Sequence, residues 1–550
     1  MTDRLIIIGG VAGGATAAAR ARRLNEKAEI ILFERGEYIS FANCGLPYYL
    51  GKVIKKREDL LVTTPEDLSR RYRVDVRTFS EVMAIHRDRR EVEVKNTKTG
   101  DIYNEPYDKI ILSPGAEPIR PPLRGIDLDN IFSVRNLSDI DRIKQLVDEV
   151  RPEKAVVVGG GFIGLEMAEN LVRRKVTVTI VEKMNQVMTP LDIEMAAIAQ
   201  SHMEKKGITL LLGNGVEGFE KSEKGLRVLT EKGGGLDCDL VILAIGVQPE
   251  NHLAVNAGLD AGEGGGIRTD GLMRTEDPDI FAVGDAVEVP EYITGKPVMI
   301  PLAGPANKQG RIAAENAMGR GTQYRGCLGT SIVEIFNLAL ARTGLNETML
   351  KSGNMAYKKS YTTSVSHASY YPGAEDLTIK LLFSPDDGTV LGAQIAGFKG
   401  VDKRIDVIAT AIRGKMTVYD LEELELAYAP PFSSAKDPVN VAGFVAANIL
   451  RGDLETIHWD ELGSLDREQH VLIDLRTAGE IKRHGAVPGS RNIPIDDLRG
   501  MLSELDRNKT YILFCAVGLR GYVAYRILVQ NGFSARSFSG GHWVYKHAVN

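Results

Sequence analysis

Short runs of apolar residues alternate with glycine-rich segments along the first half of the chain. The run at residues 5–8 leads into Gly9–Gly14 and an alanine-rich segment to Leu24, and a second run at 29–33 ends at Glu34. Apolar runs of this length, bounded by glycine, are typical of buried strands. The pattern predicts a strand, a glycine turn, a helix and a second strand that ends in an acid.

The same order of segments occurs a second time. A run at residues 155–158 leads into Gly159–Gly164, then a helix to about Arg174, and a strand at 177–181 ends at Glu182. Glycine lets the backbone approach a pyrophosphate, and the helix N-terminus presents free N–H groups to it. The acid hydrogen-bonds a ribose hydroxyl. We therefore predict two dinucleotide-binding motifs.

These two motifs supply most of the predicted cofactor-binding residues. They are Gly9, Val11, Ala12, Gly13, Gly14, Glu34 and Arg35 in the first motif, and Gly159, Gly161, Ile163, Gly164 and Glu182 in the second. Val11 stands where a middle glycine is expected, but Glu34 follows Gly14 by 20 residues, which restores the match. The Glu182 carboxylate favours NADH because it repels the 2′-phosphate of NADPH, and the neighbouring Lys183 weakens that inference.

A third glycine feature is a short apolar strand that ends at Gly284 and Asp285. Taken alone it is a strand followed by a turn, but two nucleotide motifs precede it. Here the sequence resembles the two-dinucleotide-binding flavoprotein disulfide reductases over about residues 1–445. The resemblance implies bound FAD, with Asp285 on its ribityl chain. It also implies that residues 113–116, which include Gly115, and residues 244–247 cross between the FAD and NAD domains.

One cysteine, Cys44, follows the first motif, within residues 40–48. Because no second cysteine lies nearby, a dithiol mechanism is excluded there, but a single thiolate attacks a disulfide or persulfide. The alternative is a buried, inert thiol. The single cysteine resembles coenzyme A disulfide reductases, NADH oxidases and NADH peroxidases. The oxygen and peroxide enzymes place a histidine where this chain has Ala12. We assign catalysis to Cys44 and Asn43, and substrate binding to Ser40 and Asn43.

Two tyrosines replace the His–Glu pair of ordinary disulfide reductases. Coenzyme A disulfide reductases carry such tyrosines, and the resemblance implies that Tyr370 and Tyr428 act on the partner's cysteine in a homodimer. A phenol donates a proton to a leaving sulfur; the alternative is simple packing beside prolines. For the phosphates of coenzyme A we predict Arg20 and Arg23, which share a helix face. The alternative for these arginines is a solvated helix end.

The last 90 or so residues resemble a single rhodanese sulfurtransferase domain. Cys515 lies between a strand and a helix, so that successive N–H groups curl round its sulfur, and Arg520 adds positive charge. The spacing Cys-x4-Arg is shorter than the Cys-x5-Arg of phosphatase loops and favours sulfur. We assign Cys515 and Arg520 to catalysis. The alternative is an inactive docking domain.

Composition excludes several other classes. Four cysteines in 550 residues cannot form a disulfide framework. A net charge of −5 creates no strong field for nucleic acid. No run of 18 apolar residues is present, and the N-terminal run predicts a strand rather than a signal peptide. We expect a cytoplasmic protein. The nine histidines show no paired metal spacing, so no metal site is predicted.

The predicted fold class is α/β, with two Rossmann-like FAD/NAD(P)-binding domains, an α+β dimerisation domain and a C-terminal α/β rhodanese domain. The predicted limits are 1–115 and 246–325 for the FAD domain, 116–245 for the NAD domain, 326–447 for dimerisation, 448–458 for a linker and 459–550 for rhodanese. The predicted function is FAD-dependent, NADH-driven reduction of coenzyme A persulfide, polysulfide or coenzyme A disulfide. Coenzyme A is then a substrate or a bound mixed disulfide. The alternatives are an NADH oxidase or peroxidase that uses a Cys44 sulfenate, and a slow sulfur-carrier or redox-sensing flavoprotein.

Overall fold

The computed structural model describes residues 4–223 and 225–549 and divides into two compact units. The first unit comprises Met1–Asn185 and Gly207–Gly329, and the second comprises Gln186–Lys206 and Thr330–Asn550. Residues 186–206 lie inside the segment predicted as the NAD-binding domain, yet they belong to the second unit. Among the described helices, none is long and apolar enough to cross a membrane.

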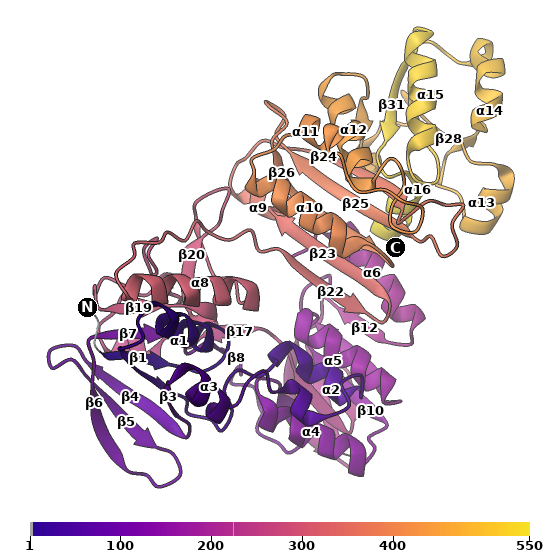
Figure 1. Ribbon diagram of the computed structural model, residues 1–550. Helices are drawn as coiled ribbons and strands as arrows, with labels where there is room; N and C mark the ends of the chain where they lie inside the picture. Colours follow the sequence, from indigo (N-terminus) through magenta and orange to yellow (C-terminus); the bar gives the residue numbers. More distant parts are fainter. Residues whose placement is uncertain (1–3, 224, 550) are drawn as a thin grey trace. The chain divides into compact units, whose positions relative to one another are not determined.

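The first motif forms a parallel sheet in the first unit. Its order is β19 (Ile280–Ala282), β7 (Lys109–Leu112), β1 (Arg4–Ile8), β2 (Glu29–Phe33) and β3 (Asp75–Arg77). The helix α1 (Ala12–Leu24) follows β1 and packs along α8 (Ala303–Ala317) (Figure 1). The close approach of α1 and α8 requires small residues, since a Cβ at Gly310 would lie 2.2 Å from the Gly13 carbonyl oxygen. The strand, helix and strand predicted for residues 5–33 are confirmed.

The second motif forms another parallel sheet in the same unit. Its order is β12 (Thr209–Leu212), β11 (Thr177–Glu182), β10 (Lys154–Val158), β16 (Leu240–Leu243) and β9 (Ile131–Ser133), and its helices are α4 (Leu137–Glu149) and α5 (Phe162–Arg173). The central strand β10 is apolar and buried from Ala155 onward, because it pairs with a strand on each side. The second predicted motif is therefore confirmed as well.

Smaller elements complete the first unit. One antiparallel sheet contains β4 (Ser80–His86), β5 (Glu91–Asn96) and β6 (Ile102–Pro106), and another contains β13 (Val216–Ser222), β14 (Gly225–Thr230) and β15 (Gly235–Cys238). The other strands are the pair β8 (Ala116–Pro118) and β17 (Val247–Pro249), together with β18 (Ile267–Arg268), β20 (Val287–Pro290) and β21 (Pro297–Val298). The other helices are α2 (Leu46–Leu50), α3 (Pro65–Tyr72) and α7 (His252–Asn256). Cys238 ends β15 and Cys327 lies in a loop, and both thiols are buried.

The second unit begins with a five-stranded antiparallel sheet. Its order is β22 (Ser331–Ile335), β23 (Leu338–Gly344), β26 (Val390–Gly397), β25 (Asp376–Phe383) and β24 (Lys358–Val365). The surrounding helices are α6 (Ile193–Lys205), α9 (Glu347–Ser352), α10 (Val401–Arg413), α11 (Val418–Glu423) and α12 (Pro438–Leu450). The strand β26 is buried along its whole length, because helices such as α10 and α6 cover the sheet.

The C-terminal part of this unit is a parallel sheet with helices around it. Its order is β27 (Thr456–Ile457), β31 (Ser534–Phe538), β30 (Thr510–Phe514), β28 (His470–Asp474) and β29 (Arg491–Asn492), and its helices are α13 (Ala478–His484), α14 (Ile495–Leu498), α15 (Leu519–Gln530) and α16 (Gly541–Val549). The predicted linker, residues 448–458, contains the end of α12 and the strand β27. The predicted α/β class is confirmed.

A buried ionic cluster lies at the sheet of the second unit. The Lys380 ammonium is fully buried in β25 and pairs with the carboxylates of Asp192, Glu194 and Glu347, the first at 2.7 Å. These attractions raise the pKa of Lys380 despite its burial. The burial of four charged groups is tolerable only because each group is paired.

Candidate active site

The two glycine turns have the same geometry in the first unit. Gly9 has φ +96° and Gly159 has φ +105°, a region that residues with a side chain rarely adopt. A Cβ at Gly14 would lie 1.8 Å from the carbonyl oxygen of Gly9, and one at Gly164 would lie 2.0 Å from that of Gly159. Only glycine therefore permits the first turn of each helix to pack against the end of its strand.

The two predicted ribose-binding acids are held in the same way. Glu34 accepts hydrogen bonds from two backbone N–H groups, both at 2.9 Å. One N–H lies in the glycine turn, and the other belongs to the residue two positions after Glu34. Glu182 accepts the equivalent bonds at 2.6 and 2.8 Å. Each carboxylate is thus fixed at the edge of its turn. Lys183 points to Glu231, 3.6 Å away, and its side chain is 76% exposed.

The remaining predicted nucleotide contacts lie around the same turns. Val11 and Gly161 are the N-cap residues of α1 and α5, Ala12 begins α1, Gly13 follows it, and Ile163 lies in the first turn of α5. A Cβ at Gly161 or at Gly115 would meet no atom within 4 Å, so that both backbones border open space. Arg35 is held by Glu250 at 2.5 and 2.9 Å.

Asp285 has the properties required of a residue that binds a flavin side chain. It lies in a short 3-10 turn, Gly284–Ala286, directly after β19. Burial raises the pKa of its carboxyl to about 6. Within the described residues its carboxyl has no hydrogen-bond partner. A buried carboxyl without a partner is costly, and a ligand hydroxyl would satisfy it. The residues present therefore fit FAD.

Cys44 lies in the 3-10 turn Asn43–Gly45 that leads into α2. The side chains of Asn43 and Cys44 are exposed, and nearby Ser40 holds a φ of +45°. The protein around the thiol raises its pKa through desolvation first, and through the negative charges of Glu166 and Asp285 second. Cys44 therefore lies close to the acid predicted to bind flavin and to the helix of the second nucleotide motif.

Sequence reasoning missed Glu166 and Tyr48. The hydroxyl of Tyr48, on α2, donates a 2.9 Å hydrogen bond to the carboxylate of Glu166, on α5. Burial raises the pKa of the Glu166 carboxyl, while the bond from Tyr48 opposes that rise. Glu166 follows Gly164 by two residues. An acid in the first turns of a nucleotide-binding helix is the sequence signal that would have identified Glu166.

The two arginines predicted to bind phosphate differ in their surroundings. Arg20 is largely buried and donates to Glu315 at 2.9 Å. Arg23 is exposed, and within the described residues it forms no ion pair. Arg22, between them, is buried and donates to the backbone carbonyls of Tyr72 and Arg73. Arg22 thus has a structural role.

The two predicted tyrosines meet in the second unit. The Tyr370 and Tyr428 hydroxyl oxygens lie 2.8 Å apart, and the side chains are 74% and 48% exposed. The hydrogen bond to Tyr428 raises the pKa of Tyr370. The neighbouring Tyr371 packs edge-on against His367.

Cys515 lies at the base of the loop between β30 and α15. Its thiol is buried, and its sulfur accepts a 3.1 Å hydrogen bond from the N–H of Gly518. Arg520 faces the sulfur of Cys515, and this sulfur contributes to the raised pKa of the Arg520 guanidinium. The larger contribution comes from Glu480, which pairs with Arg520 at 2.6 and 2.9 Å.

Sequence reasoning missed Glu480 as the partner of Arg520. Its signal was the spacing Thr477-x-x-Glu480, which caps α13. Asp474 and Arg476 are buried against each other, with a shortest distance of 2.6 Å. Arg476 also donates to the carbonyl of Gly485, so this pair holds the loop before β29 in place.

Fold and site together define a two-dinucleotide-binding oxidoreductase with one exposed thiol, Cys44, and a second, buried thiol, Cys515, in the loop between β30 and α15. The sequence matches the family described as pyridine nucleotide-disulphide oxidoreductase over residues 3–310, its dimerisation domain over 330–438, and the rhodanese-like domain over 459–546. The chain therefore belongs to the pyridine nucleotide-disulphide oxidoreductase family, and the family implies FAD and NAD(P)H as cofactors.

Known proteins share both the core and the full architecture. The coenzyme A disulfide reductase of Staphylococcus aureus (strain JH9) is 35% identical over 445 residues, which cover 80% of this chain and 99% of that protein. The crystal structure of reduced Bacillus anthracis CoADR-RHD has 48% identity and a TM-score of 0.97, with 99% and 98% of the two chains covered. A NAD-dependent persulfide reductase from A. fulgidus has 35% identity and a TM-score of 0.93, with 98% and 100% covered.

Proposed function

We propose that this enzyme uses NADH to reduce the sulfur–sulfur bond of coenzyme A persulfide, polysulfide or coenzyme A disulfide. The observation that carries the proposal is the exposed thiol of Cys44, set beside Asp285, in the turn that follows β19, and Glu166, on the helix α5 of the second nucleotide motif. The relatives that share the core and the full architecture are named for reactions of this kind. The second thiol, Cys515, handles sulfane sulfur.

The first step takes place at the Cys44 sulfur. The thiolate attacks the coenzyme A sulfur of the persulfide, forms a Cys44–coenzyme A disulfide and expels HS⁻. With coenzyme A disulfide the leaving group is the coenzyme A thiolate instead. The raised pKa of the thiol means that the thiolate is a minor species at neutral pH, and attack draws on that fraction.

Release of coenzyme A requires two electrons and one proton. Bound FAD would supply the electron pair, taken from NAD(P)H as hydride. The sum is NADH, one proton and coenzyme A persulfide giving NAD⁺, coenzyme A and H₂S. Gly9, Gly14, Glu34 and Asp285 would hold FAD, and Gly159, Gly164 and Glu182 would hold the nicotinamide nucleotide.

The tyrosine pair is the proposed proton donor. Tyr370 and Tyr428 are exposed and far along the chain from Cys44, and they act on the Cys44 of the other subunit in a homodimer. The dimerisation domain supports that assembly. One phenol donates to the other at 2.8 Å, and the second hydroxyl proton is then directed to the leaving sulfur.

Arg23 and Arg20 are the proposed contacts for the coenzyme A phosphates, with Ser40 and Asn43 nearer the sulfur. Arg23 is exposed and lacks an ion pair within the described residues, so it is ready to bind a phosphate. Arg20 must share its charge with Glu315. Arg23 is therefore the stronger of the two contacts.

In the rhodanese domain the proposed carrier is a Cys515 persulfide. The Cys515 thiolate attacks the outer sulfur of a polysulfide or persulfide donor, takes that sulfur and releases the shortened thiolate. The N–H of Gly518 and the Arg520 guanidinium stabilise the resulting anion. Coenzyme A thiolate then accepts the sulfur and becomes the persulfide that Cys44 reduces.

A comparison of acceptors tests the proposal. NADH oxidation is followed for the purified flavin-loaded enzyme with coenzyme A persulfide, coenzyme A disulfide, inorganic polysulfide or oxygen, while sulfide is measured in parallel. We expect one sulfide released for each NADH oxidised with coenzyme A persulfide, and little oxygen uptake. Fast oxygen consumption that leaves the sulfur acceptors unreduced would show that the enzyme is an NADH oxidase instead.

A further inference from the structure

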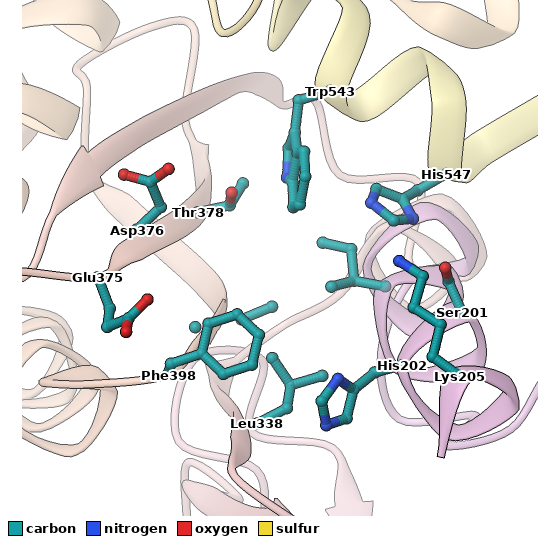
Figure 2. A pocket seen from close by; sticks show the side chains of 13 residues that line it. Ser201, His202, Lys205, Leu338, Glu375, Asp376, Thr378, Phe398, Trp543 and His547 are labelled. Carbon is teal, nitrogen blue, oxygen red and sulfur yellow. The ribbon is translucent and has the colours of Figure 1, made fainter. Parts of the chain in front are cut away.

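The Cys515 loop, between β30 and α15, is held through its backbone by α16. The N–H of His542 donates to the Cys515 carbonyl, and the N–H of Trp543 donates to the Ala516 carbonyl, both at 2.9 Å. The rings of Trp543 and His547, one turn apart on this helix, pack against each other with centroids 4.6 Å apart (Figure 2). The backbone of the loop therefore has a fixed support on the α16 side.

Two groups of the loop are placed to stabilise negative charge on the Cys515 sulfur. The Gly518 N–H lies 3.1 Å from the sulfur and belongs to the supported backbone. Arg520 reaches the sulfur with its side chain, which is 31% exposed. A long, partly exposed side chain has many rotamers available, so the loop backbone alone does not fix the direction of the guanidinium. Arg520 therefore needs a second contact to stay facing the sulfur.

Glu480, on α13, supplies this second contact. Its carboxylate accepts from both terminal nitrogens of Arg520, at 2.6 and 2.9 Å. The carboxylate is itself fixed, since it accepts from the backbone N–H of Thr477 at 2.9 Å and from the Thr477 hydroxyl at 3.0 Å. A guanidinium has five N–H donors in one planar fork. The pair with Glu480 therefore sets the plane of the fork and leaves other N–H groups for the sulfur.

We propose that Glu480 is a positioning residue for sulfur transfer at Cys515, because it holds Arg520 in the orientation that stabilises a persulfide anion. The inference rests on the proposed sulfur-carrier role of Cys515. When the Cys515 thiolate takes the outer sulfur of a donor, one S–S bond forms, another breaks, and the donor leaves as a thiolate. The negative charge on Cys515 thereby moves outward by about 2 Å. The Gly518 N–H stays with the inner sulfur, and the held guanidinium stabilises the charge on the outer one.

Two other roles for Glu480 lead to different expectations. If Glu480 only caps α13, its loss lowers stability and leaves sulfur transfer by the folded protein unchanged. If its negative charge mainly weakens the attraction of Arg520 for the sulfur, its removal speeds sulfur transfer. A positioning role instead requires that removal slows sulfur transfer, and that this slowing disappears when Arg520 is absent.

Sulfur loading of Cys515 distinguishes these roles. All variants are made in the flavin-loaded Cys44→Ser protein, so that no sulfur is taken up at position 44. The protein is mixed with saturating inorganic polysulfide and quenched with iodoacetamide at set times. Intact-protein mass spectrometry then follows the gain of one sulfur atom. The Cys44→Ser, Cys515→Ser double variant gives the background, and circular dichroism shows that each variant is folded.

We expect Glu480→Ala to slow loading at least about tenfold, because displacement of a catalytic group costs up to about 100-fold. Glu480→Gln should lie between Glu480→Ala and the unaltered residue, since its amide oxygen still accepts an N–H of Arg520. Combined with Arg520→Met, Glu480→Ala should change the rate by less than about twofold. Glu461→Ala is the matched control and should load normally. Glu461 likewise accepts from a capping-box backbone, the His458 N–H at 2.8 Å, and pairs with an arginine, Arg536, at 3.5 Å.

An unchanged or faster rate in Glu480→Ala would overturn the proposal, and so would an equal slowing with and without Arg520. If Glu480→Ala does not fold, Glu480→Gln is compared in the same way with and without Arg520→Met. Cys515 that takes up no sulfur in the Cys44→Ser protein would remove the carrier role and the positioning role together. Normal loading that does not depend on Glu480 would remove the positioning role alone.

Discussion

The hydroxyl oxygens of Tyr370 and Tyr428 lie 2.8 Å apart, although 58 residues separate them in the chain. Tyr370 lies in the turn between β24 and β25, and Tyr428 follows α11. Since Tyr370 is 74% exposed and Tyr428 is about half-exposed, burial in the core does not account for the contact. The pair presents two phenols on one surface, joined by a single hydrogen bond.

Removal of either hydroxyl should slow the reductase reaction. We expect Tyr370→Phe and Tyr428→Phe each to lower kcat with coenzyme A disulfide by about 100-fold, the lower end of what a general acid contributes. The double variant should be no more than about threefold slower than the worse single one, because the two hydroxyls act as a unit. Steady-state NADH oxidation measures all three. Tyr371→Phe is the control, and multiplicative losses in the double variant would contradict a shared role.

Glu182 should determine the choice between NADH and NADPH. Its carboxylate is fixed by two backbone N–H groups at 2.6 and 2.8 Å, and a carboxylate at this position repels a 2′-phosphate. We expect kcat/KM to favour NADH by at least about tenfold, and Glu182→Ala to reduce that preference about tenfold. Lys183→Ala should change the ratio little, because that lysine points to Glu231. A preference that survives Glu182→Ala would rule out this role.

The Cys44 thiol should titrate above its ordinary value. Desolvation, Glu166 and Asp285 all favour the neutral thiol, so the rate of alkylation by iodoacetamide should still rise with pH above the usual pKa of about 8.5. Glu166→Gln removes one negative charge and should shift the midpoint to lower pH by up to about one unit. The exposed Glu149→Gln on α4 is the control. A midpoint that Glu166→Gln leaves unchanged would contradict the electrostatic account.

Lys380 should be essential for the stability of the second unit. Lys380→Met leaves Asp192, Glu194 and Glu347 buried without their shared cation, which typically costs about 3–5 kcal/mol. The urea midpoint followed by circular dichroism should therefore fall clearly. Lys358→Met, an exposed lysine in β24, should leave the midpoint nearly unchanged. Equal midpoints for the two variants would show that the cluster contributes little.

Local backbone requirements made the nucleotide motifs predictable. Gly14 and Gly164 admit no side chain because a strand-end carbonyl lies within 2.0 Å of the Cβ position, so the motif is a property of a short segment. The Cys515 loop was predictable for the same reason, as strand, loop and helix are contiguous. Such features depend on residues that are adjacent in the sequence, so the sequence alone is enough to predict them.

Partners from distant segments were not predictable. Arg520 was expected to act on Cys515, and it also donates two hydrogen bonds to Glu480, 40 residues away, which the sequence did not predict. Lys380 lies in the run Leu377–Phe383, in which nothing indicates that three carboxylates from other segments surround it. The same cluster is one of the contacts that join residues 186–206 to the second unit, since Asp192 and Glu194 belong to them. Tertiary packing alone fixes these pairs.

The central claim is that a single thiol, Cys44, forms the mixed disulfide with coenzyme A. Intact-protein mass spectrometry of the flavin-loaded enzyme, incubated with coenzyme A disulfide without NADH, measures this most directly. We predict one coenzyme A adduct per chain in the unaltered enzyme, its loss on addition of NADH, and no adduct in Cys44→Ser, while Cys515→Ser behaves normally. An adduct that persists in Cys44→Ser, or sulfide release from coenzyme A persulfide that is undiminished in that variant, would contradict the account.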